Sequence, residues 1–347
     1  MTITAPRVDG LGQPEADPSP PAGETETEPS IDTVRALAER YSNWGRWGPD
    51  DELGTLNHIR ESDVVAASAL VRSGKTFSLA IPVDENGPQS GGFGRFNPIH
   101  LMIRDGNAAA TGTVVRDFYG GRDRWIRGTD DLLIMPLQAG TQWDALAHIV
   151  FDRRIYNGYD ATDVGSKGAI RNDIAKMRDR VVGRGVLLDI PRSRGVPWLE
   201  PGERIDGSDL QACADAQGVD IRRGDIVLVR TGQMAQCHAD GAWGTYAGGS
   251  APGLGLDAVP WIADHEIAAV ASDTWGVEVL PNETPDVFQP LHIILIVHMG
   301  LLVGEIFDLE GLAADCADDG RYDFLFTAPP LPITGGVGSP VNPLAIK

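Results

Sequence analysis

Short apolar runs rich in β-branched residues recur along the second half of the chain, with helical stretches between the first four of them. Apolar runs of about four to eight residues bounded by Gly or Pro are typical of buried strands. Strands that alternate with helices predict an α/β fold, with a mixed sheet and surrounding helices. The expected strands are residues 186–190, 225–231, 267–272, 301–307 and 322–327, and the expected helices are residues 208–217, 259–266 and 289–298.

The first thirty residues differ in composition from the rest of the chain. They include six Pro and six acidic residues and almost no large apolar side chain. Such a segment cannot bury enough apolar surface to offset the entropy lost on ordering. We therefore expect residues 1–30 to form a disordered tail. Because no repeat or linker follows, we expect residues 31–347 to form a single domain, which begins with a helix over 31–41 capped by Ser30.

Residues 84–97 form a glycine-rich loop with two aromatic side chains. The loop lacks the Lys-Ser/Thr pair of a phosphate-binding loop, which argues against a nucleotide site. We expect either a mobile lid that brings Phe93 and Phe96 to a pocket or an ordinary surface loop. His100, in the strand expected after this loop, is a further candidate for substrate contact. Other expected elements are a helix over 62–73 ended by Gly74, and strands over 76–83, 98–104 and 131–137.

The chain carries 29 Lys and Arg against 49 Asp and Glu, a formal net charge of −20. A surface of this charge repels nucleic-acid phosphate and anionic lipid, so we expect neither nucleic acid nor a membrane as partner. The longest apolar run, residues 293–303, is too short to cross a bilayer, and the N-terminus lacks the apolar core of a secretory signal. Together with three widely spaced cysteines, these features favour a cytoplasmic protein that acts on a small molecule.

Polar side chains gather after an apolar run, residues 132–135, that we expect to form a buried strand. Polar groups at the end of a strand often form active sites, because rigid backbone meets a loop there. Alternatively, the stretch 137–148 is a turn in which the Asp caps backbone groups and the His belongs to the core. The stretch by itself leaves both interpretations open. Its polar residues are Gln138, Gln142, Asp144 and His148.

A second pair of polar residues lies in apolar surroundings. His292 opens the expected helix over 289–298, and Glu305 lies within the expected strand over 301–307. A carboxylate in an apolar segment is costly unless it is paired or coordinates a metal. We therefore expect Glu305 to contact a histidine, a metal or the substrate. For His292 alone, a core histidine bonded to backbone is the default interpretation.

These residues carry a family resemblance. The motif Gly140-Thr141-x-x-Asp144-x-x-x-His148 resembles His-x-Gly-Thr-His-x-Asp-x-Pro-x-His, the signature of the cyclase family that includes bacterial kynurenine formamidase and isatin hydrolase. Pro290-Leu291-His292, followed by Gly300 and Glu305, resembles the family's later His…Gly…Glu segment. Residues 46–57 and 331–340 are similar to stretches in a longer branch of the family. The resemblance implies a swivelling β/β/α fold, and it favours a homodimer or homotetramer.

The resemblance also implies a metal site, from which this chain departs. The family's two leading histidine ligands stand where the chain has Gln138 and Gln142, and the Pro after the Asp is Leu146. A neutral amide is a poor ligand for Zn²⁺ or Mn²⁺ compared with imidazole. We expect either no cofactor or one divalent Mn or Zn ion. The ligands that remain are Asp144, His292 and Glu305.

The implied activity is hydrolysis of an amide, imide or lactone bond in a small cyclic or aryl substrate, as in an arylformamidase. His148 matches the family's general acid/base, and with Asp144 it would activate water or move protons. The alternatives are a metal-free cyclase or dehydratase acting on a polyketide-like ring, and a ligand-binding relic without activity. The side chains expected to contact substrate are Gln138, Gln142, Trp143, Phe93, Phe96 and His100.

Overall fold

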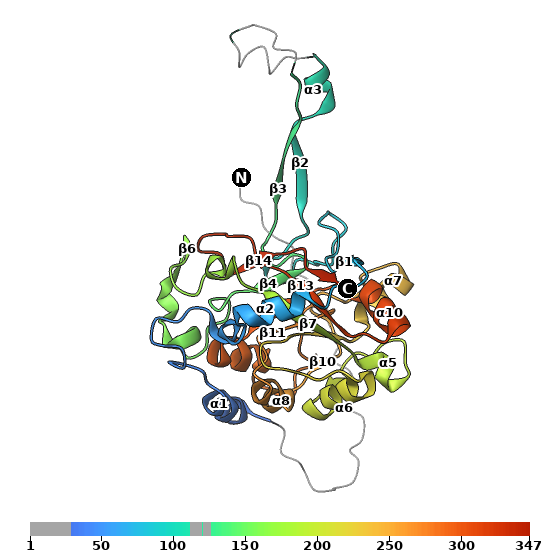
Figure 1. Ribbon diagram of the computed structural model, residues 1–347. Coiled ribbons are helices and arrows are strands. Elements are labelled where there is room, and N and C mark those ends of the chain that lie inside the picture. Colours follow the sequence, from blue (N-terminus) through green and yellow to red (C-terminus); the bar gives the residue numbers. More distant parts are fainter. Residues whose placement is uncertain (1–28, 112–119, 121–125) are drawn as a thin grey trace, which may run out of the picture.

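A nine-stranded mixed sheet forms the centre of the computed structural model, which describes residues 29–111, 120 and 126–347 (Figure 1). The strand order is β1-β15-β13-β7-β9-β11-β12-β4-β14. The central strands β7, β9, β11 and β12 are parallel to one another, and the pairs outside them are antiparallel. The strands are β1 (Thr76–Ser78), β4 (Gln142–Asp144), β7 (Val182–Asp189), β9 (Ile226–Arg230), β11 (Ala269–Ser272), β12 (Leu302–Glu305), β13 (Asp323–Thr327), β14 (Gly338–Pro340) and β15 (Leu344–Ile346).

The apolar runs that predicted the sheet form its parallel centre. The register aligns Val186 with Val227, Val227 with Val270, and Val270 with Val303, and all four valines are buried. A parallel strand is covered on both faces, so its sequence is apolar throughout instead of alternating. The expected α/β fold with a mixed sheet is confirmed. Of the expected N-terminal tail, residues 1–28 lie outside the described residues.

Helices cover the sheet, and some of them begin at a residue whose side chain caps the helix. Ser30 caps the first helix and shares a capping box with Thr33, and Asp206 does the same with Asp209 for α6. In Figure 1, α6 and α8 lie below the central strands. No helix in the described ranges is long and apolar enough to span a bilayer. The helices are α1 (Ile31–Arg40), α2 (Glu61–Ser68), α3 (Gly106–Thr111), α5 (Ile190–Arg194), α6 (Gly207–Gln217), α7 (Gln233–Asp240), α8 (Ala258–Asp264), α9 (Pro290–His292) and α10 (Glu310–Asp319).

Short elements join these layers. A parallel pair, β8 and β10, and an antiparallel pair, β5 and β6, lie outside the main sheet. Single helical turns carry several of the loops. These elements are β5 (Val164–Gly165), β6 (Gly168–Ala169), β8 (Arg204–Ile205), β10 (Gly253–Leu254), η1 (Gly54–His58), η2 (Gly92–Gly94), η3 (Tyr156–Gly158), η4 (Ala161–Asp163), η5 (Ile174–Met177) and η6 (Ile293–Met299).

Helix α2 is shorter than the expected helix over 62–73. It ends at Ser68, and the N–H groups of Ser73 and Gly74 both donate to the carbonyl of Lys347. The C-terminal residue therefore takes up backbone groups that a longer helix would have used. The expected strand over 76–83 is likewise shortened to β1, with one isolated bridge between Ala80 and Phe307 beyond it.

The strands β2 (Ile99–Arg104) and β3 (Asp130–Ile134) form a two-stranded arm that projects from the body (Figure 1). The expectation of a buried strand at 132–135 is therefore wrong, since Leu133 is 48% and Ile134 49% exposed. The run is apolar enough for burial on both faces. However, β2 and β3 form a separate two-stranded sheet outside the main sheet, and the arm projects from the body. The expected homodimer or homotetramer stays a prediction.

The expected helix over 289–298 is present but is not a regular α-helix. It begins as α9 at Pro290 and continues as the π-helix η6 from Ile293 to Met299. Gly300 ends it with a φ of +67°, and a Cβ there would meet the Tyr156 ring at 2.3 Å. π-helical turns are rare and often lie at functional sites. This irregular helix places His292 beside the end of β12.

Candidate functional site

Strands β4 and β12 bring three polar side chains to one face of the sheet. The strands pair antiparallel, with Gln142 opposite Glu305 and Asp144 opposite Val303. Successive side chains on a strand point to opposite faces, so Gln142 and Asp144 share the face that Glu305 also occupies. All three are almost completely buried, with exposed fractions of 0% to 2%. The amide of Gln142 donates to Glu305 at 2.7 Å and to Asp144 at 3.4 Å.

His292 completes this cluster from the other side. Its Nε2 lies 3.2 Å from Glu305, and its Nδ1 lies 2.5 Å from an oxygen of Glu278. Glu278 also accepts the backbone N–H groups of Leu291 and His292, each at 3.1 Å. The imidazole is thus fixed in orientation by a buried carboxylate behind it. We call Gln142, Asp144, Glu278, His292 and Glu305 the open cluster.

The charges of the open cluster set the proton affinity of His292. Burial by itself disfavours the imidazolium, but the hydrogen bonds to Glu278 and Glu305 outweigh it and raise the pKa of His292 to about 10. Glu278 and Glu305 thus favour the protonated imidazole, which offsets their own negative charges in an apolar interior. A divalent cation bound at Nε2 would take the place of the proton there.

Asp144 and His148 form the edge of the cluster. Burial raises the pKa of Asp144 to about 6, against the opposing effect of His148, whose Nε2 lies 3.8 Å from Asp144 Oδ1. Burial likewise lowers the pKa of His148, and Asp144 counteracts part of that shift. At neutral pH His148 is therefore neutral and able to accept a proton beside an ionised carboxylate.

Several polar atoms around the cluster have no partner. Among the described residues, the buried atoms Asp144 Oδ2, Gln142 Oε1 and Gln138 Nε2 make no hydrogen bond. Buried polar groups are nearly always paired, so unpaired ones that lie together beside a cavity are candidates for contact with a ligand. Gln138 reaches this position because Gly338 has no side chain, since a Cβ there would lie 2.5 Å from Gln138 Nε2.

The open cluster also suits a divalent cation. One ligand atom from each of Asp144, His292 and Glu305 lies within 4.8 Å of the others. The Glu278–His292 contact is the carboxylate–histidine arrangement that orients metal ligands. The free Oδ2 of Asp144 supplies an acceptor without a protein partner. These residues fit the metal site implied by the sequence, with Glu278 as a supporting residue.

A cavity of about 510 Å³ opens beside the cluster, and His148, Gln138 and His292 line it. Its outer wall is aromatic. Phe93 stacks on Trp275 at 6.1 Å and on Phe288 at 5.9 Å between ring centroids. Phe93 has a φ of +55°, a left-handed conformation unusual for an aromatic residue. Phe93 lines this cavity and is 75% exposed, and its contact with a substrate stays a prediction.

Three residues expected to contact substrate lie elsewhere. Trp143 points to the opposite face of β4, where it is fully buried and its Nε1 donates to the carbonyl of Ala328. Phe96 is 42% exposed and does not line the cavity. His100 lies on the exposed arm and pairs with Asp131 at 2.8 Å. The expectations for Trp143, Phe96 and His100 are corrected accordingly.

Sequence reasoning missed two residues of this site, Glu278 and Arg95. Glu278 lies six residues after β11 in an almost wholly buried segment, and the argument applied to Glu305 would also have singled it out. Arg95 lines the cavity from the glycine-rich loop, with its guanidinium 5.1 Å from the centroid of the Trp275 ring. An Arg in a surface loop carries no comparable sequence signal.

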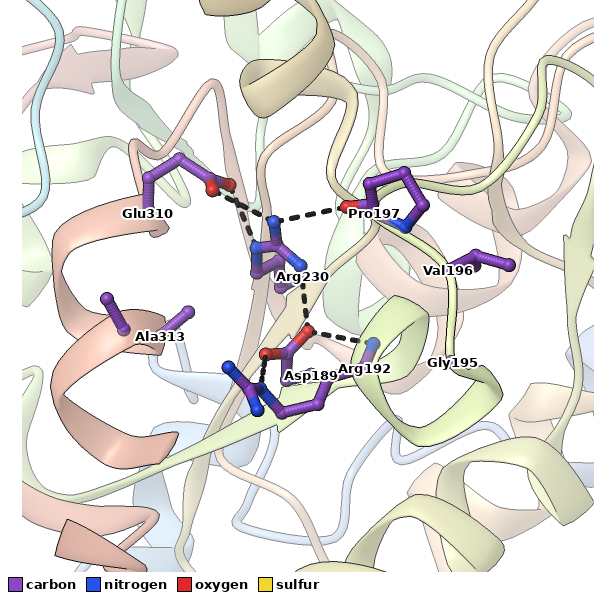
Figure 2. A pocket seen from close by; sticks show the side chains of 9 residues that line it. Asp189, Arg192, Gly195, Val196, Pro197, Arg230, Glu310 and Ala313 are labelled. Carbon is purple, nitrogen blue, oxygen red and sulfur yellow. Dashed lines mark hydrogen bonds and ion pairs between the residues drawn. The ribbon is translucent and has the colours of Figure 1, made fainter. Parts of the chain in front are cut away.

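A second buried charge cluster lies at another cavity, shown in Figure 2. Arg230, at the end of β9, bonds Glu310 through Nε and Nη2 at 2.9 Å and Asp189 through Nη1 at 2.8 Å. Its Nη2 also approaches the carbonyl of Pro197 at 3.4 Å. We call Asp189, Arg230 and Glu310 the closed cluster.

Comparisons with known proteins agree with the sequence resemblance. The Cyclase family model, described as "Putative cyclase", matches residues 77–279, more than half of the 347-residue chain. A solved structure described as a novel cyclase is 38% identical with a TM-score of 0.79, over 89% of this chain and 99% of that chain. No curated protein matches.

Two isatin hydrolases share the fold at low identity. Isatin hydrolase A from Ralstonia solanacearum is 19% identical with a TM-score of 0.55, over 83% of this chain and 97% of that chain. Isatin hydrolase A from Labrenzia aggregata, solved bound to benzyl benzoate, is 18% identical with a TM-score of 0.54, over 82% of this chain and 97% of that chain. The family match and the 38% identical relative carry the assignment, and the chain belongs to the cyclase family.

Proposed function

We propose that this protein hydrolyses an amide, imide or lactone bond in a small cyclic or aryl substrate. The observation that carries the proposal is the Asp144–His148 pair, which borders an aromatic-walled cavity beside an unpartnered Gln138 amide. A base, a hydrogen-bond donor and a place for a planar ring are thus within one site. These are the parts that hydrolysis of an aryl acyl compound requires.

In the proposed reaction His148 takes a proton from the attacking water. The lowered pKa of His148 keeps the imidazole neutral before the reaction. The Asp144 carboxylate, 3.8 Å away, stabilises the imidazolium that forms. His148 then gives the proton to the departing nitrogen or oxygen, which completes the cleavage.

The developing negative charge on the substrate carbonyl is assigned to Gln138. Its Nε2 has no partner among the described residues, so a hydrogen bond to an oxyanion requires no existing bond to break. Such a donor contributes about 3 kcal/mol to transition-state stabilisation. Gln142 serves differently, because its N–H groups already hold Glu305 and Asp144 together. We assign Gln142 to positioning these carboxylates.

Asp144, His292 and Glu305 would hold a divalent Mn or Zn ion, oriented by Glu278. When bound, such an ion supplies Lewis acidity and lowers the pKa of water. The experiment is metal analysis of the purified protein with titration of Mn²⁺ and Zn²⁺ by calorimetry. We expect binding that weakens about 10-fold to 100-fold in Glu278→Gln. A wild type that binds neither ion would contradict the metal assignment while leaving the roles of His148 and Gln138 standing.

Activity is tested by a screen of aryl formamides, cyclic imides and lactones. The wild type, Asp144→Asn and a control with the exposed His238 changed to Ala are assayed in parallel, before and after chelation. We expect the wild type and the His238→Ala variant to hydrolyse at least one class and Asp144→Asn to hydrolyse none measurably. If no class is turned over faster by the wild type than by Asp144→Asn, the proposed function is wrong.

A further inference from the structure

Arg95 brings a positive charge to the aromatic wall of the cavity. It is the only Arg or Lys among the described residues that line this cavity. Its guanidinium lies 5.1 Å from the centroid of the Trp275 ring, beside the stack of Phe93 on Trp275. The flat guanidinium is thus held near the place where a planar ligand would stack.

Arg95 differs from several other partly buried arginines of the body, although Arg223 and Arg321 also form no ion pair among the described residues. Arg184, Arg194 and Arg230 each form ion pairs with two carboxylates. Within the described part of the chain, Arg95 forms no ion pair, although the protein carries 49 acidic residues. Its donors are therefore available to a ligand. A guanidinium presents five N–H groups in a fork that matches a carboxylate.

Arg95 lies in the same cavity as the proposed base. His148 and His292 line this cavity together with Arg95 and the aromatic residues. Phe93, Phe288, Arg95 and His148 all line this cavity, so a ring placed against the two phenylalanines shares the cavity with both Arg95 and His148.

We propose that the substrate is a planar aryl compound bearing a carboxylate, and that Arg95 binds this carboxylate while the aromatic wall holds the ring. The proposal rests on the proposed hydrolysis and adds the substrate class. It makes Arg95 a specificity-determining residue, because a neutral analogue leaves its guanidinium without a partner. The bond that is cleaved, and the path of the proton, are unchanged.

The first test measures binding and requires no turnover. Benzoate and benzamide are titrated by calorimetry against the full chain, Arg95→Gln, Arg95→Lys and the control Arg72→Gln, whose arginine is exposed and lies outside the cavity. We expect the wild type and Arg72→Gln to bind benzoate at least about 10-fold more tightly than benzamide, a difference typical of one charge-assisted contact. Arg95→Gln should lose this preference and Arg95→Lys should retain part of it. Equal binding of the two ligands by the wild type, or an unchanged preference in Arg95→Gln, would overturn the proposal.

The second test separates this proposal from the proposed function. The same titrations are made with Asp144→Asn, which should keep the preference for benzoate although it cannot hydrolyse. If the activity screen finds no substrate but Arg95 still determines the preference, hydrolysis fails and the anion site stands. If substrates are found, each is compared with its methyl ester. In the wild type the free acid should have a lower KM than its methyl ester, and Arg95→Gln should lose this difference. If the wild type and Arg95→Gln show the same difference in KM, the proposed substrate class is wrong, whereas the proposed hydrolysis stands.

Discussion

The open and closed clusters both bring buried or partly buried charged groups together at the main sheet, but they differ in hydrogen bonding. In the closed cluster, Glu310 and Asp189 occupy the Arg230 guanidinium, and they raise its pKa against the effect of burial (Figure 2). In the open cluster, one oxygen of Asp144 and one of Gln142 have no partner among the described residues. The neighbouring Gln138 also keeps a free N–H group.

The difference shows how buried charge is used in two ways. A fully bonded cluster has no capacity left for a ligand, so its contribution is to the folded structure. A partly bonded cluster costs stability until something occupies the free atoms, and a substrate or ion can do so. Both clusters border cavities, but of the two only the open cluster has buried polar atoms without a partner among the described residues. For this reason we propose that the reaction takes place at the open cluster.

The largest effect on activity is expected at His148. His148→Gln removes the proton acceptor but keeps a polar side chain at the cavity, so kcat should fall about 100-fold to 10,000-fold. Unfolding should change little, because His148 makes no hydrogen bond within 3.5 Å to Asp144. Kinetics and thermal unfolding of the same preparation check this. If His148→Gln unfolds readily but keeps its kcat, His148 contributes to the stability of the fold and not to catalysis.

The largest effect on stability is expected at Arg230. Arg230→Met removes the guanidinium from the buried Asp189, which keeps only Arg192, and from the partly exposed Glu310, which should cost about 3 kcal/mol. Activity per folded molecule should be unchanged at a temperature where the variant is still folded. Denaturant unfolding measures the free energy of unfolding of the variant. If kcat/KM of Arg230→Met falls more than about tenfold, the closed cluster also contributes to activity and the distinction between the clusters is wrong.

A smaller effect on activity is expected at Gln138. Gln138→Leu removes the unpaired donor and should lower kcat about 100-fold, with little change in KM, because the bond forms in the transition state. Gln211→Leu, an exposed position outside the cavity, serves as control. A Gln138→Leu enzyme with reduced affinity but full kcat would mean that this amide binds the ground state instead.

The smallest effect concerns pH and two buried histidines. The carboxylates on both sides of His292 outweigh the effect of burial and raise its pKa. For His58 the direction is the opposite: burial, followed by the charge of Arg46, lowers the pKa to about 4, against the opposing effect of Glu266. Unfolded His58 takes a proton near pH 6.5 but folded His58 does not until about pH 4. Stability should therefore fall as pH drops from 6.5 to 4, by an amount on the order of 1 kcal/mol after solvent screening.

Denaturant unfolding at pH 7.5 and pH 4.5 measures this difference. His58→Gln cannot take up the proton, so its free energy of unfolding should decrease less between the two pH values than that of the wild type. A decrease of the same size in both proteins would show that other groups cause the acid sensitivity.

The sequence predicted the parts of the fold whose signals are local. The apolar runs of β7, β9, β11 and β12 predicted buried strands of a mixed sheet, and the structure shows that these strands form its parallel centre. The cap at Ser30 likewise predicted the start of α1. By contrast, β14 lies within a Pro- and Gly-rich segment, and pairing with β4, far away in sequence, is what makes it a strand.

The site was predictable to a similar extent. Asp144, His292 and Glu305 were expected to share a site, and the structure brings them together. The orientation of Trp143 could have been foreseen, because it lies between two residues that face the cluster and must therefore point the other way. Arg95 could not, since its role depends on the loop packing against Trp275, which lies 180 residues further along the chain.

The most direct test compares two matched substitutions, Asp144→Asn in the open cluster and Glu310→Gln in the closed cluster. Each replaces one carboxylate of a cluster by an amide of the same shape, at a buried position for Asp144 and a partly exposed one for Glu310. The measurement is kcat/KM per folded molecule for a substrate found in the screen. The distinction between the clusters predicts a loss of at least about 1,000-fold for Asp144→Asn and less than about twofold for Glu310→Gln. Equal losses in the two variants, or full activity in Asp144→Asn, would contradict it.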